Sequence, residues 1–342
     1  MSDQAITATS VSAIQQIGQV ANAVAANHTF ADYRDRKADN TLRRQDADLA
    51  LFADYLAAVG IVAGELHTDL AAWQGITWGL VAGFVQWMLH EGYATGSVNV
   101  RLSTIKTYAK LASKAGALDK LEYLQIKDVT GYSHKECKRL DEKRIESGAV
   151  TRRGNKKAEA VRISIEQAKA LKNSQSDTPQ GRRDAMLMCL LIDHGLRCGE
   201  VALLDVTHVD LKAGELKFYR PKVDKVQTHR LTTDTKRAMQ KWFDTDVPAV
   251  GPLLRASRKG GHLTSAGMTE RAITKRVEYL GAQIGVQGLS AHDCRHYWAT
   301  TAARKGTDPF RLQEAGGWNS LAMPRRYVET AKIANAGVIL EE

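Results

Sequence analysis

The sequence holds few of the residues that indicate a metal-binding or disulfide-stabilised protein. Its 342 residues include four cysteines, which form no Cys-x-x-Cys pair and no Cys/His group with zinc spacing. We therefore expect reduced thiols in a cytoplasmic protein. The sequence also has no nucleotide-binding loop and no carboxylate cluster, so we expect neither a cofactor nor a metal ion.

Long apolar segments are missing as well. The longest apolar run, residues 185–192, is far too short to cross a bilayer, which needs about 20 apolar residues. The first 28 residues lack the basic start and the solid apolar centre of a signal peptide. We expect a protein without membrane contact, and we find no internal repeat or low-complexity tract.

Acidic residues are outnumbered by basic ones. Lys and Arg total 48 against 38 Asp and Glu, which gives a net charge of +10. Basic surface gains free energy when it releases counterions from phosphates, so this balance favours a nucleic-acid partner. A merely basic globular protein is the alternative, because the contents of 44% hydrophobic and 25% charged residues are ordinary.

The composition changes along the chain in a way that predicts two domains. Residues 1–30 are rich in Ala, Ser and Thr and predict a mobile arm or a weak helix, and residues 31–135 predict a helical domain. Residues 136–160 are rich in basic residues and poor in large apolar ones, which is typical of a linker. Residues 161–342 form the second predicted domain.

Apolar periodicity predicts most of the secondary structure. In the first domain, three apolar stripes with helical spacing end at Gly60, Gly92 and Gly116. In the second domain, apolar and polar residues alternate on both sides of Gly214, which predicts a β-hairpin. A further strand should end near Leu231, and we expect the remainder to be helical.

Seven residues of the second domain can together bind and attack one phosphate. They are Arg197, Glu200, Lys222, His292, Arg295, Trp318 and Tyr327. Two guanidiniums can clamp anionic oxygens with forked hydrogen bonds, an indole N–H can bind another oxygen, and a phenol can attack phosphorus. The leaving sugar hydroxyl needs a proton, which Lys222 or Lys225 can supply. We therefore expect phosphoryl transfer to Tyr327, with DNA as the substrate.

Each of these residues also has a plain structural explanation. Arg197 and Glu200 can form an ion pair at a helix end, and Tyr327 can be a half-buried core aromatic. Trp318 can be a core residue, and a lone histidine such as His292 is commonly a packed or surface residue. The hypothesis depends on the combination.

In order and spacing, the seven residues resemble the tyrosine recombinase (phage integrase) family. The string LSAHDCRHYWAT resembles the His-x-x-Arg box of the family, and LQEAGGWNSLAMPRRYVE resembles its terminal box. Trp318 stands where many members have histidine, which makes the chain most similar to Cre recombinase. The resemblance implies a mainly α protein: a helical N-terminal core-binding domain that clamps DNA, and a mixed α+β catalytic domain with a small antiparallel sheet.

The resemblance also implies a reaction. Tyr327 would attack the scissile phosphate and keep the 3′ phosphate, while Lys222, or Lys225 in its place, would protonate the leaving 5′ oxygen. A partner strand would then attack the phosphotyrosine, and recombination would pass through a Holliday junction. Because the ester conserves the bond energy, neither ATP nor a metal ion is implied.

The remaining members of the set take supporting roles in the family. Arg197, Arg295 and Trp318 would hold the non-bridging oxygens of the phosphate. His292 would assist proton transfer at the nucleophile, and Glu200 would orient the site.

The expected partners are double-stranded DNA with inverted-repeat recombination sites and three further copies of the chain, in a homotetramer joined by an exchanged C-terminal helix. Such a protein would act in the cytoplasm on the nucleoid of a prokaryote, a phage or a mobile element. Six basic residues are candidates for DNA contact, with Arg271 as the first choice for guanine. They are Arg271, Lys275, Arg101, Lys106, Arg152 and Arg153.

Two other functions compete with this hypothesis. A type IB topoisomerase-like enzyme would use the same nucleophile and phosphate clamp but would act as a monomer on one strand. A non-catalytic DNA-binding architectural protein would keep the basic surface and would need none of the seven residues.

Overall fold

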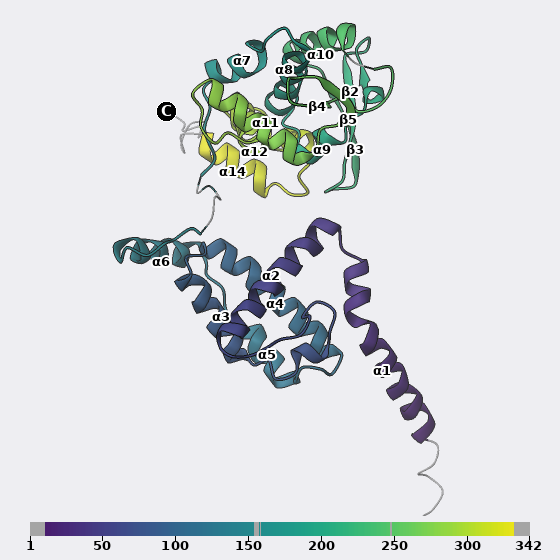
Figure 1. The fold of residues 1–342 in the computed structure, drawn as a ribbon, viewed down its shortest axis with the longest axis vertical. Helices are drawn as coiled ribbons and strands as arrows, with labels where there is room; N and C mark the ends of the chain where they lie inside the picture. Colours follow the sequence, from purple (N-terminus) through teal and green to yellow (C-terminus); the bar gives the residue numbers. More distant parts are fainter. Residues whose placement is uncertain (1–10, 154–156, 158, 247, 332–342) are drawn as a thin grey trace, which may run out of the picture. The chain divides into compact units, whose positions relative to one another are not determined.

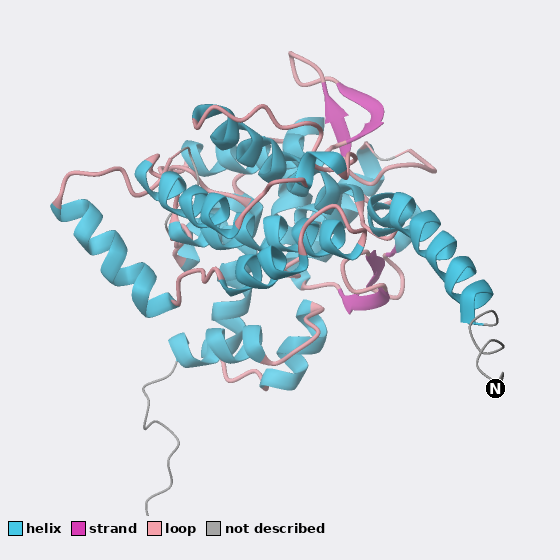
Figure 2. Cartoon of the chain, turned by 90° about the horizontal axis from the view of Figure 1, so that it is seen from below, coloured by secondary structure: helices cyan, strands magenta, loops and turns pink. Residues whose placement is uncertain are grey.

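The computed structural model describes residues 11–153, 157, 159–246 and 248–331 of the chain. The chain divides into two compact units, residues 1–156 and 157–342. Helices dominate both units, and the strands form two small sheets in the second (Figures 1 and 2). The mainly α fold with a small antiparallel sheet, expected from the sequence, is confirmed. Among the described residues, no helix is long and apolar enough to cross a membrane.

The first unit is a helical bundle around one apolar core. Its elements are α1 (Val11–Asp35), α2 (Asp39–Ala58), the short 3-10 helix η1 (Ala71–Trp73), α3 (Trp78–His90), α4 (Thr95–Lys114), α5 (Lys120–Asp128) and α6 (His134–Glu146). The predicted apolar stripes lie in α2, α3 and α4, and Phe52, Val85 and Ile105 are buried. Trp78 is 49% exposed, because it is the first helical residue of α3 after the Thr77 cap.

Two segments outside the expected helical domain contain helices. Residues 11–30 of the expected arm belong to α1, and residues 136–146 of the expected linker belong to α6. Within α6, Arg144 is buried and donates to the Leu89 carbonyl oxygen at 2.9 Å. Residues 1–10 lie outside the described residues, and the boundaries of the arm and the linker stay predictions.

The second unit combines helices with two antiparallel sheets. Its elements are α7 (Ile165–Asn173), α8 (Pro179–Ile192), α9 (Cys198–Ala202), η2 (Val206–His208), β1 (Val209–Asp210), β2 (Glu215–Arg220), β3 (Lys225–Arg230), α10 (Thr233–Thr245), β4 (Arg255–Ser257), β5 (Leu263–Gly267), α11 (Glu270–Gln283), α12 (Ala291–Arg304), α13 (Pro309–Gly316) and α14 (Ala322–Ala331). The hairpin around Gly214 and the strand before Leu231 are confirmed. The expectation that the rest is helical is wrong at β4 and β5, which are short and pair through a β-bulge without alternating large apolar residues.

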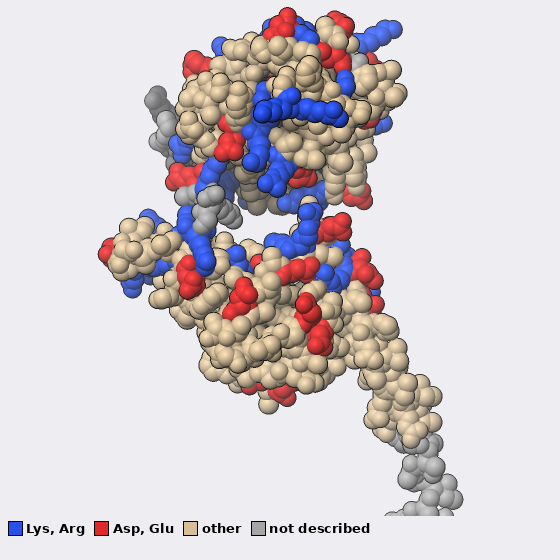
Figure 3. Space-filling model, viewed as in Figure 1, with Lys and Arg blue, Asp and Glu red and all other residues tan. Residues whose placement is uncertain are grey.

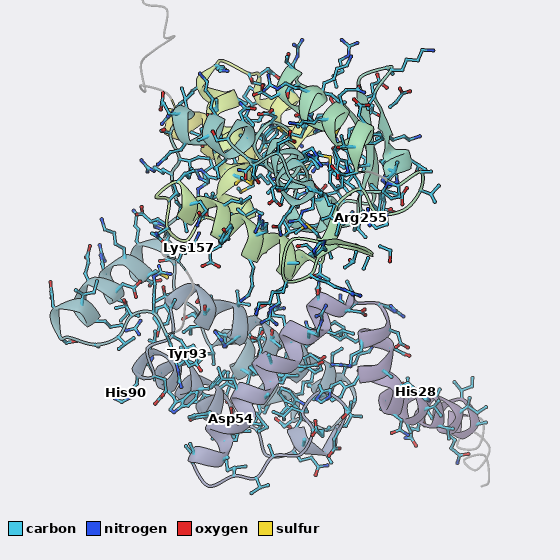
Figure 4. All side chains as sticks on the ribbon, turned by 45° about the horizontal axis from the view of Figure 1, so that its top comes forward. His28, Asp54, His90, Tyr93, Lys157 and Arg255 are labelled. Carbon is cyan, nitrogen blue, oxygen red and sulfur yellow. The ribbon has the colours of Figure 1, made fainter. Side chains whose placement is uncertain are left out.

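The helices α12, α13 and α14 enclose a small apolar cluster of their own. Ala299, Ala303, Leu312 and Tyr327 are buried in it, and α12 and α14 pack side by side (Figure 1). The start of α12 is fixed by Asp293, whose carboxylate accepts hydrogen bonds from Ser290, from the Val161 N–H and from the Lys157 ammonium (labelled in Figure 4). The helix that carries His292 and Arg295 therefore has a well-anchored first turn.

Candidate active site

Arg197 lies directly before α9 and links this helix to a distant turn. Its Nη1 donates to Glu200 Oε1 at 2.7 Å, and its backbone N–H donates to Glu200 Oε2 at 2.8 Å. Its Nη2 donates to the Gly317 carbonyl oxygen at 3.0 Å. The helix-end ion pair with Glu200 is therefore present, and it holds the guanidinium in a fixed orientation.

Arg295 is buried in α12, one turn after His292. Its Nη2 donates to the Gly316 carbonyl oxygen at 2.6 Å, and its Nη1 donates to the Gly195 carbonyl oxygen. Its guanidinium carbon lies 4.5 Å from the centroid of the Trp318 ring, in a cation–π arrangement. His292 is exposed to solvent in the first turn of the same helix.

The last carbonyls of α13 each receive a side-chain hydrogen bond. Four consecutive carbonyls are involved, and their donors are Gln227 to Glu314 at 2.7 Å, Arg220 to Ala315 at 2.7 Å, Arg295 to Gly316 and Arg197 to Gly317. The end of a helix leaves such oxygens without partners inside the helix and carries partial negative charge, which attracts guanidiniums. The helix end that leads into Trp318 is therefore held from four places: β2, β3, α12 and the residue before α9.

Glycine is required at this helix end. A Cβ atom on Gly316 would lie 1.9 Å from the Trp318 ring, and one on Gly317 would lie 2.5 Å from Arg220 Cδ. Gly317 also has a φ of +58°, in the left-handed region that ends many helices. The Gly-Gly pair lets the indole ring and the guanidinium approach the backbone closely.

Arg197, Arg220, Arg295 and Glu200 form a unit that we name the arginine cluster. Arg220 is fully buried, and its Nη1 donates to both Glu200 oxygens at 2.9 and 2.8 Å. Burial and the neighbouring charges of Arg197 and Arg220 lower the pKa of Arg295. Burial also lowers the pKa of Arg220. The cluster has three guanidiniums and one carboxylate, which only Arg197 and Arg220 bind, so an incoming anion would relieve the repulsion among the guanidiniums.

Tyr327 lies beside Trp318 and a second histidine. The ring centroids of Tyr327 and Trp318 are 5.8 Å apart, and those of Tyr327 and His296 are 5.0 Å apart in an edge arrangement. Tyr327 is 3% exposed, and burial raises the pKa of its phenol, while Arg295 and Arg326 act in the opposite direction. Burial and the charge of His292 lower the pKa of His296, which favours a neutral imidazole next to the phenol.

The two candidate proton donors lie on the β2–β3 turn. Lys222 is exposed within the turn, and Lys225 is the first residue of β3. The Lys225 ammonium is 4.0 Å from Glu314 Oε1, too far for a hydrogen bond. The choice between the two lysines stays open.

Three residues of the site were not predicted from the sequence: Arg220, Gln227 and His296. A signal for Arg220 is present in β2, where Leu216, Phe218 and Arg220 alternate and all three are buried. An arginine at an inward-facing position of a strand is unusual and indicates a buried anionic or carbonyl partner. No comparable pattern marks Gln227, whereas His296 directly follows Arg295.

The candidate DNA-binding residues differ in their surroundings. Arg271 and Lys275 are exposed on α11, opposite the buried Ile273 and Val277, and Arg and Lys side chains form a band on the visible face of the second unit (Figure 3).

Within the described residues, no group of three or more His, Cys, Asp or Glu could hold a metal ion.

In the first unit, two of the candidates pack on an aromatic ring. The guanidinium carbons of Arg101 and Arg153 lie 4.6 and 5.3 Å from the centroid of Tyr93 (labelled in Figure 4). Lys106 is partly buried and donates to the Lys127 carbonyl oxygen at 2.7 Å, whereas Arg152 is exposed. These four residues do not form one uniform cationic face.

Comparison with known proteins decides the family. Residues 162–333, half of the chain, match the sequence model of the phage integrase family. The chain belongs to this family. The resemblance found in the sequence is thus confirmed, and with it the prediction of a tyrosine-type recombinase, an enzyme that acts on DNA; the particular likeness to Cre stays a prediction.

Relatives and solved structures agree with the membership of the phage integrase family. The tyrosine recombinase XerC of Oceanobacillus iheyensis is 23% identical over 328 residues, which cover 89% of this chain and 91% of the relative. The XerC of Actinobacillus succinogenes is 30% identical over 169 residues, 48% of this chain and 55% of the relative. The fold is similar to that of the Tn1549 transposon integrase in complex with transposon right end DNA, with a TM-score of 0.60, 13% identity, and coverage of 88% of this chain and 94% of that one. A lambda integrase dimer bound to a COC′ core site matches with a TM-score of 0.57, 13% identity, and coverage of 92% and 98%.

Proposed function

We propose that the protein is a site-specific DNA recombinase that cleaves and rejoins strands through a 3′-phosphotyrosine intermediate. The observation that carries the proposal is the excess positive charge of the arginine cluster next to Trp318, whose ring centroid lies 5.8 Å from that of Tyr327. Fixed positive groups beside a nucleophile stabilise the charge that develops when a phosphodiester is attacked.

The proposed chemistry consists of two exchanges at one phosphorus atom. The phenol oxygen of Tyr327 attacks phosphorus, the bond from phosphorus to the 5′ oxygen breaks, and Lys222, or Lys225 in its place, gives that oxygen a proton. The phenol proton leaves with the help of His292. In the reverse step the 5′ hydroxyl of a partner strand attacks and releases the tyrosine. The ester bond energy is conserved, so the cycle needs no ATP and no metal ion.

Arg197, Arg295 and Trp318 would bind the non-bridging oxygens. Each already makes contacts that restrict its orientation: Arg197 with Glu200 at 2.7 Å, and Arg295 with the Gly316 carbonyl at 2.6 Å and the face of Trp318. Preorganised donors of this kind lower the barrier because they need not reorient during the reaction.

The proposed substrate is double-stranded DNA with inverted-repeat sites, bound by a homotetramer that resolves a Holliday junction. DNA complexes of the Tn1549 integrase and of lambda integrase, which share the fold, support DNA as the partner. Arg271 and Lys275 on the exposed face of α11 would contact the major groove. The C-terminal segment proposed for exchange between subunits extends outside the described residues. We place the protein in the cytoplasm, on the nucleoid.

The test is the detection of a covalent protein–DNA adduct. The purified protein is incubated with DNA fragments from both sides of its own gene, and the products are separated on a denaturing gel. We expect an adduct with the wild-type protein and none with Tyr327→Phe, which should bind the same DNA with unchanged affinity because it loses one oxygen atom. An adduct formed by Tyr327→Phe would refute the assignment of the nucleophile.

A second measurement separates recombination from strand passage. Two plasmids that each carry the mapped cleavage site should exchange strands in the presence of the protein. A type IB topoisomerase-like enzyme would instead relax a supercoiled plasmid without exchange between sites, and an architectural protein would do neither.

A further inference from the structure

Arg220 and Gln227 lie inside the β2–β3 hairpin, on either side of the turn that carries Lys222. Arg220 is the last residue of β2, and Gln227 is the third residue of β3. Arg220 is fully buried and Gln227 is 9% exposed. The Arg220 Nε donates to Gln227 Oε1, so the two side chains are joined across the hairpin.

Both side chains bind the same helix end outside the hairpin. Arg220 Nη2 donates to the Ala315 carbonyl oxygen and Gln227 Nε2 donates to the Glu314 carbonyl oxygen, each at 2.7 Å. Arg220 Nη1 also binds the Glu200 carboxylate, which orients Arg197. All three guanidinium nitrogens of Arg220 therefore donate hydrogen bonds.

We propose that Arg220 and Gln227 are positioning residues that latch the lysine-bearing turn to the end of α13. The inference rests on the function proposed above. Arg197 and Arg295 hold the same helix end from α9 and from α12, so α13 keeps two guanidinium contacts when Arg220 is replaced. The hairpin, in contrast, loses its bonds to both Glu200 and Ala315. Loss of the latch therefore acts mainly on the turn with Lys222.

A displaced proton donor has a specific chemical consequence. Protonation of the leaving 5′ oxygen by a general acid contributes about 100-fold or more to such a reaction. The contribution disappears when the leaving group is a thiolate, which departs without a proton. Replacing the bridging 5′ oxygen by sulfur therefore reports on the proton donor separately from phosphate binding.

The experiment uses the full chain and the duplex whose cleavage position the adduct assay identifies, with oxygen or with sulfur at the bridging 5′ position. On the oxygen duplex we expect Arg220→Met to form adduct about 30-fold more slowly and Gln227→Leu about fivefold more slowly than the wild type. On the sulfur duplex both variants should come within about threefold of the wild type. The affinity for DNA should change less than about twofold, because Arg220 is buried.

Arg183→Met is the matched control, because Arg183 is a buried arginine of the same unit that binds Asp184 and the Arg255 carbonyl instead. Rates are expressed per folded molecule, and Arg183→Met should cleave both duplexes like the wild type. If Arg220→Met fails to fold, the rates of Gln227→Leu on the oxygen and sulfur duplexes test the proposal instead. The proposed latch would be refuted if Arg220→Met and Gln227→Leu lost cleavage rate equally on both duplexes, or if they cleaved as fast as Arg183→Met. A wild-type protein that forms no adduct would instead refute the proposed function.

Discussion

The second unit contains two groups of arginines that differ in the partners of their guanidiniums. In the first, which we name the remote cluster, Arg183 and Arg276 bind opposite oxygens of the buried Asp184 carboxylate, Arg183 at 2.8 Å. Arg183 also donates to the carbonyl oxygen of Arg255 at 2.9 Å (labelled in Figure 4). The remote cluster ties α8 to α11 and to β4, and it points to a structural role.

In the arginine cluster, Arg197 and Arg220 bind the single Glu200 carboxylate, and Arg295 donates only to backbone carbonyls. Carbonyl oxygens carry only partial charge, so they satisfy the hydrogen bonds without neutralising the cations. A buried arginine is therefore not by itself a sign of an anion site. The remote cluster has two guanidiniums and one carboxylate, whereas the arginine cluster has three guanidiniums and one carboxylate, and this ratio distinguishes the two clusters.

The largest expected difference between the clusters is in DNA cleavage. Arg295→Gln should lower the rate of adduct formation by about 1,000-fold, because it removes a preorganised positive donor. Arg183→Met should leave the rate per folded molecule unchanged. The rates are measured in single turnover with enzyme in excess. A loss of cleavage in Arg183→Met as large as that in Arg295→Gln would remove the distinction.

Gly316→Ala should disturb the arginine cluster by displacing a neighbouring ring, without removing a charge. The added methyl group would lie 1.9 Å from the Trp318 ring, so the ring must leave the face of Arg295. We expect cleavage about 100-fold slower, since small displacements of positioned groups have effects of this size.

The control for Gly316→Ala is Gly285→Ala, at a glycine with a φ of +78° where an added Cβ meets nothing within 4 Å. This variant should lose some stability but keep its cleavage rate. Equal cleavage rates for the two alanine variants would show that the position of Trp318 is unimportant.

Stability should rank the two variants in the opposite order: Arg183→Met should lower the free energy of unfolding more than Arg295→Gln. Arg183→Met leaves the buried Asp184 with one guanidinium in place of two and should lower the free energy of unfolding by about 3 kcal/mol. Arg295→Gln should cost less, because burial and two neighbouring guanidiniums already disfavour its charged form, as the lowered pKa of Arg295 indicates. Urea denaturation of both variants gives the comparison, and a larger loss in Arg295→Gln would contradict it.

The smallest expected effect is the response to inorganic phosphate. At matched ionic strength, phosphate in place of chloride should stabilise the wild type by about 1 kcal/mol, because an anion bound only by the folded state stabilises that state. The midpoint of thermal unfolding should rise accordingly in the wild type and in Arg183→Met, and the rise should vanish in Arg295→Gln. A rise of equal size in all three proteins would mean that phosphate acts elsewhere.

The sequence was sufficient for the elements and side chains that carry patterns of their own. Helical stripes and the alternation around Gly214 predicted most elements, and the spacing of Arg197, His292, Arg295 and Tyr327 predicted the family. Arg220 was not predicted as a site residue, because its acceptor is the carbonyl of Ala315, 95 positions later in the chain. Every residue has a carbonyl, so such a partner leaves no trace in the sequence.

Surroundings that form only in the folded chain explain the other differences. Arg101, a candidate for DNA contact, packs on Tyr93 and lies near Asp48, with 3.8 Å between Arg101 Nε and Asp48 Oδ1. β4 and β5 were missed because backbone pairing, and not apolar alternation, joins them. Asp48 is 53 positions before Arg101, and β4 and β5 are adjacent in the chain but carry no apolar alternation, so no local pattern identified either feature.

The backbone bonds at the end of α13 also determine how freely this segment can change in evolution. Glu314 and Ala315 take part through their carbonyl oxygens, and Glu314 is exposed, so their side chains can drift without disturbing the hydrogen bonds. Gly316 and Gly317, which have no side chain, are the two positions that tolerate no replacement. Tolerant and intolerant positions should therefore stand next to each other in a saturation scan of residues 314–317, with the boundary between Ala315 and Gly316.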